Sequence, residues 1–167
     1  GRRRYQWDFD PHMEIYVVDL DGTNMRQLTD SPGYDAEGSY SFDGRQIVFA
    51  ASGDGGSRLW VRPLDTTAAQ PLAGTDGASF PFWSPDSRSI GFFTGSALQR
   101  LDLVGGTPQT LAPASIGSGG TWNANGVIVF APTRSSPLIR VPATGGSASE
   151  VTTLDPQLIG HSFPHFL

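Results

Sequence analysis

The sequence predicts an all-β protein built from several small antiparallel sheets. Glycine (21) and proline (13) are frequent and mark many turns, while the β-branched and aromatic residues between them favour short strands. No segment shows the sustained 3.6-residue apolar period of an amphipathic helix, because stretches such as "LTDSPGYDAEG" interrupt every candidate. A pattern of strands also recurs along the chain, with a spacing of roughly 40 residues.

Two sets of residues define this repeat. The first set is apolar, closes four similar segments about 40 residues apart, and consists of Leu28, Leu72, Leu111 and Val151. The second set lies in the tight turns "SFDG", "SPDS" and "NANG" and consists of Asp43, Asp86 and Asn125. A period near 40 with about four strands in each unit is typical of the blades of a β-propeller.

The four strands of each unit have different patterns. The first strand ends in a turn where Asp or Asn can bond the local backbone. The second strand, such as "QIVFAA" or "SIGFF", is almost wholly apolar, which predicts burial on both faces. The third strand alternates and ends at a polar or Gly-rich turn, and the fourth is a short edge strand. Since one such sheet cannot bury both of its faces alone, each blade must pack against neighbours. The recurring tryptophans and phenylalanines are expected in this packing.

We expect one domain over residues 1–167 with four four-stranded antiparallel blades. The units cover residues 34–74, 76–113 and 116–154, and a closing blade combines residues 4–30 with residues 160–167. In that blade "RYQWDFD" takes the place of a second strand and "GHSFPHFL" that of a first strand. One chain closed as a four-bladed ring, or two chains joined in an eight-bladed ring with two-fold symmetry, would satisfy this pattern.

Charge and composition narrow the classes of partner. The net charge is -5, and all 11 basic residues are arginine, so nucleic acid is not an expected partner. The absence of cysteine excludes disulfides and thiolate metal sites. No apolar run is long enough to span a bilayer.

The segment "IYVVDLDGTNMRQLTDSPGYDAEGSYSFDGRQIVFAAS" resembles the WD-like repeat of TolB-type propellers. The stretch from residue 57 to residue 167, with "RLWVRPLD" and "PFWSPDSRSIGFF", resembles the propeller attached to some bacterial serine/threonine kinases. The resemblance implies a propeller scaffold and favours a periplasmic or other extracytoplasmic location, with the cytoplasm left open. Phosphoryl transfer is excluded because the chain has no Gly-rich phosphate loop, no lysine and no "HRD".

No catalytic residue, metal or cofactor is expected from the sequence. There is no "GxSxG" nucleophile elbow, and His12 and His161 would meet only on one face of the closing blade. In "GYDAEG", Asp35 and Glu37 are two residues apart on a first strand and are expected to point together toward the propeller axis.

The leading hypothesis is a non-enzymatic module that binds a protein or peptide at the channel mouth. The loops between blades, and those between second and third strands, share this face. The candidate binding residues there are Tyr34, Asp35, Glu37, Asp54, Asp76, Ser79, Ser115, Arg134, His12 and His161. Two alternatives stay open. One is an engineered or truncated propeller that only assembles with itself, because the two halves resemble different branches of the family. The other is a metal- or His-dependent hydrolytic site on the rim.

Overall fold

The computed structural model describes residues 12–30, 33–53, 56–155, 157 and 159–166. Its sheets are all antiparallel: three have four strands each, and one has two strands. In chain order the strands are β1 (Tyr16–Val17), β2 (Arg26–Gln27), β3 (Tyr34–Tyr40), β4 (Gln46–Gly53), β5 (Gly56–Pro63), β6 (Gln70–Pro71), β7 (Ser79–Trp83), β8 (Ser89–Phe93), β9 (Ala97–Asp102), β10 (Gln109–Pro113), β11 (Gly120–Trp122), β12 (Val127–Phe130), β13 (Ile139–Pro142) and β14 (Ser149–Glu150).

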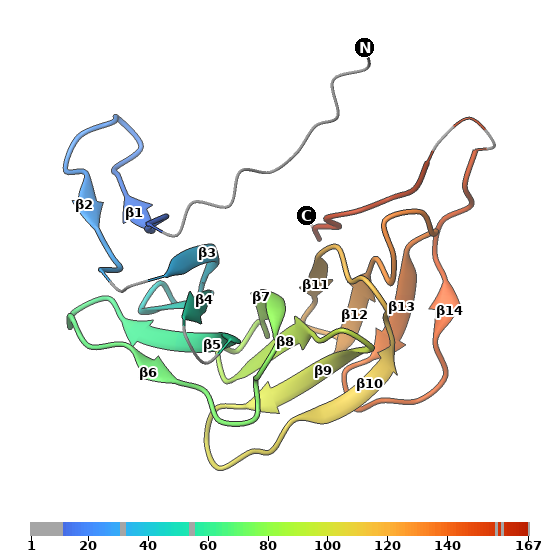
Figure 1. The fold of residues 1–167 in the computed structure, drawn as a ribbon. Helices are drawn as coiled ribbons and strands as arrows, with labels where there is room; N and C mark the ends of the chain where they lie inside the picture. Colours follow the sequence, from blue (N-terminus) through green and yellow to red (C-terminus); the bar gives the residue numbers. More distant parts are fainter. Residues whose placement is uncertain (1–11, 31–32, 54–55, 156, 158, 167) are drawn as a thin grey trace.

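The three four-stranded sheets have the architecture of propeller blades. We call β3–β6 the first blade, β7–β10 the second blade and β11–β14 the third blade. Within each blade the strands pair in chain order, so every connection is a simple hairpin. The blades follow one another around an arc, and their first strands β3, β7 and β11 lie next to each other on its inner side (Figure 1). The predicted all-β propeller architecture is confirmed.

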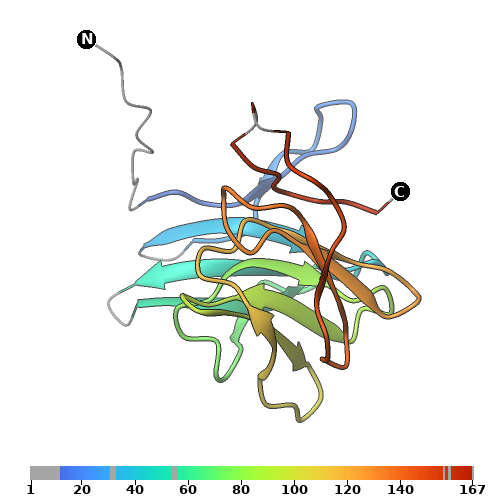
Figure 2. The same cartoon turned by 90° about the vertical axis from the view of Figure 1, so that its right-hand side faces the viewer.

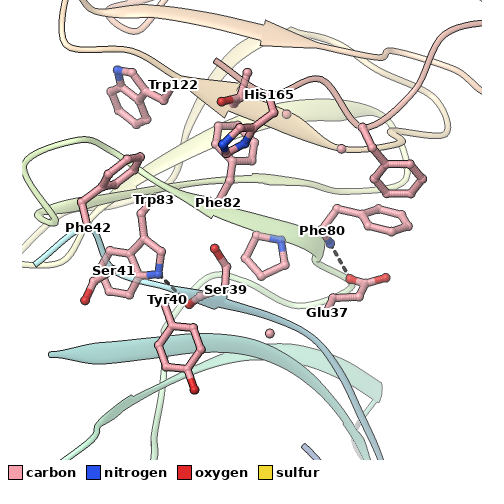
Figure 3. A pocket seen from close by; sticks show the side chains of 16 residues that line it. Glu37, Ser39, Tyr40, Ser41, Phe42, Phe80, Phe82, Trp83, Trp122 and His165 are labelled. Carbon is pink, nitrogen blue, oxygen red and sulfur yellow. Dashed lines mark hydrogen bonds between the residues drawn. The ribbon is translucent and has the colours of Figure 1, made fainter. Parts of the chain in front are cut away.

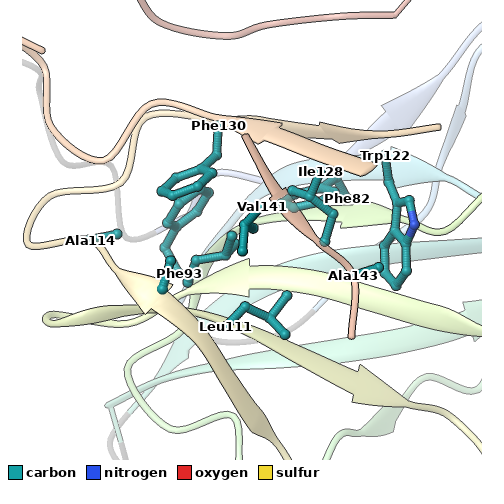
Figure 4. Close-up of a cluster of buried hydrophobic side chains, with 11 residues drawn as sticks. Phe82, Phe93, Leu111, Ala114, Trp122, Ile128, Phe130, Val141 and Ala143 are labelled. Atoms are coloured by element: carbon teal, nitrogen blue, oxygen red, sulfur yellow. The ribbon is translucent and has the colours of Figure 1, made fainter. Parts of the chain in front are cut away.

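The apolar core lies between the blades. One cluster, which includes Phe82, Phe93 and Phe130, joins the second blade to the third (Figure 4). A second cluster joins the first blade to the second, and a third one holds the β1–β2 hairpin against the first blade through Leu28. Trp83 belongs to the second cluster and is almost completely buried. The expectation that the aromatic residues pack between blades is therefore confirmed.

The turn after the first strand of each blade is closed by a side chain. In the second blade the Ser84 hydroxyl donates to Asp86 Oδ1 at 2.6 Å and accepts the backbone N–H of Ser89 at 2.9 Å. Ser41 and Asp43 repeat this arrangement in the first blade. In the third blade Asn123 replaces the pair, because its side-chain oxygen accepts the N–H groups of residues 125 and 127. Asn123 lies two residues before Asn125, which the repeat aligns with Asp43 and Asp86.

Replacing Ser84 by alanine is expected to destabilise the protein by about 1–2 kcal/mol at neutral pH, because the buried N–H of Ser89 loses its acceptor. The Ser84 hydroxyl also lowers the pKa of Asp86 below its ordinary value of 3.8. The stabilisation from this contact is complete above that value and is lost as the pH falls through the lowered pKa.

Urea unfolding of Ser84→Ala at pH 7 and near pH 3 measures both effects, with Ser147→Ala, at an exposed position of the third blade, as the control. The difference from the parent protein should be smaller at the lower pH. An equal difference at both values would disprove the contribution of Asp86.

The structure does not show the closing blade. The β1–β2 hairpin has two strands, and residues 4–10, the expected second strand, lie outside the described residues. The C-terminal segment, residues 159–166, forms no strand (Figure 2) and runs from the side of the third blade back toward the inner strands (Figure 1). It runs beside the third blade instead, where Phe163 N donates to Ser118 O at 2.9 Å. In the described residues the chain thus contains three complete blades rather than four, and ring closure stays a prediction. The native mass in solution distinguishes the monomeric ring from the dimer.

Candidate functional site: a cavity on the inner strands

A cavity of about 570 Å³ opens where the first strands of the three blades converge (Figure 3). Its walls come from β3, β7, β11 and the C-terminal segment. The lining residues are Glu37, Gly38, Ser39, Tyr40, Ser41, Phe42, Phe80, Pro81, Phe82, Trp83, Gly119, Gly120, Thr121, Trp122, Phe163 and His165. The volume lies within the range of ligand sites in proteins, and the walls are mainly aromatic.

The same backbone distortion occurs at each wall of the cavity. The β3–β4 and β7–β8 ladders each shift register in the middle of their first strand, as in a β-bulge. Glu37 has a φ of 59° and Phe80 a φ of 48°, both in the left-handed region. Gly119, directly before β11, and Phe163 in the C-terminal segment repeat this conformation with φ values of 86° and 50°. All four residues line the cavity, which links the distortion to this site.

Glu37 is the carboxylate of the cavity. Its Oε2 atom accepts the backbone N–H of Phe80 across the boundary between the first and second blades. Burial raises the pKa of Glu37 above its ordinary value, and the hydrogen bond from Phe80 acts in the opposite direction. The ring of Phe80 meets the ring of Phe163 edge to face, with centroids 5.7 Å apart.

The other end of the cavity is an aromatic surface. Trp83 is fixed by its indole N–H, which donates to the carbonyl oxygen of Ser39 at 2.8 Å. The guanidinium of Arg100 lies 5.3 Å from the ring centre of Trp122. Phe42, in contrast, is 63% exposed although it lines the cavity, and Tyr40 is 46% exposed. Phe42 is therefore accessible to a partner in the cavity without any rearrangement of the core, whereas the ring of Tyr40 points away from the other aromatic side chains (Figure 3).

The structure separates Asp35 from Glu37. Asp35 is buried, with a relative exposure of 1%, and its N–H donates to Met13 O, whereas Glu37 faces the cavity. Tyr34 starts β3 and is half-buried. The expectation that the two carboxylates point the same way does not hold, because the bulge between Ala36 and Ser39 breaks the alternation of the strand.

The predicted rim residues are spread over the molecule rather than gathered at the cavity. Asp76 is exposed and pairs with Arg58 at 2.6 Å. Ser79 is the first residue of β7, next to Phe80, and does not line the cavity. Ser115 and Arg134 lie in exposed loops, and Asp54 lies outside the described residues. Their role in binding stays a prediction.

The two histidines of the predicted rim lie beside different blades. His12 lies in an exposed turn beside the start of the first blade, one residue before Met13, whose carbonyl accepts from Asp35. His161 lies beside the third blade, with Nδ1 2.8 Å from Thr152 Oγ1 and its backbone N–H on Ser136 O. Within the described part of the chain, no group of three or more histidine and acidic side chains is placed to hold a metal ion.

Sequence reasoning found Glu37 but missed most of the cavity wall. Phe42 was not among the candidate binding residues, and Phe82 and Trp122 were expected first in the packing between blades. The available signal was the alignment of Glu37 with Phe80 and Phe163 at equivalent repeat positions. It indicates that one position of every first strand faces the same space.

Comparison with known proteins supports the repeat-based interpretation. The family model PD40, described as the TolB beta propeller domain, matches residues 7–160. The Tol-Pal system protein TolB of Bordetella pertussis is 42% identical over 53 residues, which is 31% of this chain and 12% of that protein. The chain therefore spans only a small part of the length of this relative.

Solved structures share the fold. The crystal structure of TolB from Acinetobacter baumannii superposes with a TM-score of 0.65 at 21% identity, over 81% of this chain and 39% of that one. A puromycin-hydrolyzing peptidase of Mycobacterium tuberculosis superposes with a TM-score of 0.61 at 15% identity, over 86% of this chain and 28% of that one. Identities this low show the fold alone, so a peptidase among them assigns no activity here. In the described residues no helix has the length and apolar character needed to cross a membrane. Since the family model matches most of the sequence, the chain belongs to the PD40 family of TolB β-propeller domains.

Proposed function

We propose that this chain is a non-enzymatic interaction module that binds a segment of a protein or peptide in the cavity on its inner strands. The main support is the aromatic wall, in which Phe42 remains exposed beside the buried Trp83. Exposed aromatic side chains on a rigid scaffold are typical anchors of protein interfaces. An extracytoplasmic location is part of this proposal and rests on the resemblance to TolB-type propellers.

Two of the four hydroxyl-bearing residues that line the cavity make structural hydrogen bonds, which favours binding over catalysis. Ser41 Oγ donates to Asp43 at 2.6 Å, and Thr121 Oγ1 accepts the N–H of Phe166 at 3.3 Å. Both hydroxyls thus hold turns and strands in place. A nucleophile would instead need a hydrogen bond to a general base such as His165, and none of the hydrogen bonds among the described lining residues joins a hydroxyl to that ring.

Selection of a random peptide library against the purified protein tests the proposal. We expect peptides whose affinity falls about ten-fold in Phe42→Ala, because this variant removes an exposed aromatic anchor without touching the core. Val104→Ala is the matched control, since Val104 is 92% exposed and does not line the cavity.

Two outcomes would overturn the proposal. Equal affinity of the selected peptides for Phe42→Ala and Val104→Ala would mean that the cavity is not the binding site. Cleavage of the bound peptides, detected by mass spectrometry, would show an enzyme instead of a binding module.

A further inference from the structure

We propose that the cavity accepts a cationic side chain, arginine or lysine, from the bound segment, and that Glu37 is its counter-ion. This inference rests on the proposed binding function and adds the chemistry of the group that is recognised. It is carried by the charges that line the cavity, by the ring pair beside Glu37 and by the conformation of Glu37 itself.

The lining residues carry a single fixed charge. Glu37 is their only acidic residue, and none of them is an arginine; the other groups that can titrate are His165 and Tyr40. Glu37 forms no ion pair with another described residue. Its one hydrogen bond within the described part of the chain comes from the backbone N–H of Phe80. One carboxylate oxygen is engaged in this bond, so the other is available to a ligand.

The surroundings of Glu37 suit a cation better than a neutral polar group. Phe80 is joined to Glu37 through its backbone, and its ring packs edge to face against Phe163. A guanidinium or ammonium group held by the carboxylate would therefore lie beside aromatic rings, where the ring quadrupole attracts a positive charge. Burial already disfavours the charged form of Glu37, so a bound cation would offset that cost.

The backbone at Glu37, like that at Phe80 and Phe163, is in the left-handed region. A φ of 59° costs a residue with a side chain on the order of 1–3 kcal/mol, and glycine occupies the equivalent position before β11 at no such cost. The strained conformation directs a carboxylate into the cavity at this point. Strain of this kind often accompanies binding sites; it recurs at Phe80 and Phe163, and Glu37 is the acidic residue among these strained positions of the wall.

Binding of N-acetylarginine amide, followed by two-dimensional NMR of the full chain, tests the inference directly. N-acetylcitrulline amide is the control ligand, because citrulline has nearly the same shape as arginine but no charge. We expect millimolar binding of the arginine compound, with shifts at Glu37, Phe80 and the Trp83 indole, and at least ten-fold weaker binding of the citrulline compound.

Two variants with the same change of charge separate the local effect from a general one. Glu37→Gln keeps the size of the side chain and an oxygen for the Phe80 N–H, so the fold should be retained; we expect it to bind both compounds equally weakly. Glu150→Gln, on the exposed strand β14, should behave like the parent protein. Equal affinity for arginine and citrulline in the parent protein, or undiminished arginine binding in Glu37→Gln, would overturn the inference.

The library selection distinguishes failure of this inference from failure of the proposed function. Peptides that depend on Phe42 but neither contain an essential arginine or lysine nor respond to Glu37→Gln would refute the cation site and leave the binding function intact. If no selected peptide depends on Phe42, the proposed function itself fails.

Discussion

Replacing Phe93 by alanine is expected to lower the free energy of unfolding by about 3–5 kcal/mol. The ring is completely buried and lies between Phe82 and Phe130, with centroid distances of 6.2 Å to each. Phe82 and Phe93 belong to the second blade, and Phe130 belongs to the third, so the cavity left by the substitution opens at the contact between the blades (Figure 4). Because each blade is stable only through its neighbours, this loss is a large part of a typical total of 5–15 kcal/mol.

The adjacent Phe92 makes this prediction specific. It is equally buried but points to the other face of β8, into the cluster between the first and second blades. Urea unfolding should show losses of similar size for Phe92→Ala and Phe93→Ala, and a change below about 0.5 kcal/mol for Val104→Ala.

Amide hydrogen exchange should then distinguish the Phe92→Ala variant from the Phe93→Ala variant. Phe93→Ala is expected to accelerate exchange mainly in β11–β13, and Phe92→Ala mainly in β3–β5, because each variant loosens a different pair of blades. The same exchange pattern in both variants would contradict an arrangement of separate cores between blades.

The blade architecture could be predicted because it depends on a pattern that repeats. The strand "SIGFF" became β8, and all five of its residues are buried. Its alternation also assigns the two faces, with Ile90 and Phe92 on one cluster and Phe93 on the other. Gly91 lies beneath the ring of Phe82, where a Cβ atom would come within 2.3 Å of that ring. These features follow from strand geometry, which local sequence determines.

The cavity could be predicted only in part, because it depends on departures from that geometry. Asp35 and Glu37 would share a face of an ideal strand, but one bulge residue sends them to different environments. Phe42 lines the cavity together with residues of the second and third blades, and no single repeat determines that arrangement.

Replacing Arg62 by alanine is expected to release the β1–β2 hairpin from the first blade and to cost about 2–3 kcal/mol. Arg62 lies in β5 with only 6% exposure, and its guanidinium donates to the carbonyl oxygens of Leu28 and Thr66. Leu28 follows β2 directly, so this bond ties the end of the hairpin to the blade. The variant leaves Leu28 O without its charged donor and removes the packing of the arginine stem.

Arg62→Ala should destabilise the hairpin alone, because its strands are only two residues long and are mostly exposed. Exchange should accelerate at the N–H of Asp19 and of Leu28, which hold the hairpin together by bonds to Thr23 O and Ile15 O. The amides of the second and third blades should keep their protection.

Two further variants serve as controls for the result with Arg62→Ala. Arg45→Ala removes an exposed arginine from the same blade and should leave the hairpin unchanged. Arg62→Lys keeps the charge and most of the stem but lacks the planar fork that reaches both carbonyl groups, so it should lie between the parent protein and Arg62→Ala. Accelerated exchange in all three blades of Arg62→Ala would mean that the hairpin and the blades unfold as one unit. If exchange accelerates only in the hairpin, the contact between Arg62 and Leu28 stabilises the hairpin without stabilising the contacts between blades. The cavity on β3, β7 and β11 then does not need the hairpin in order to form.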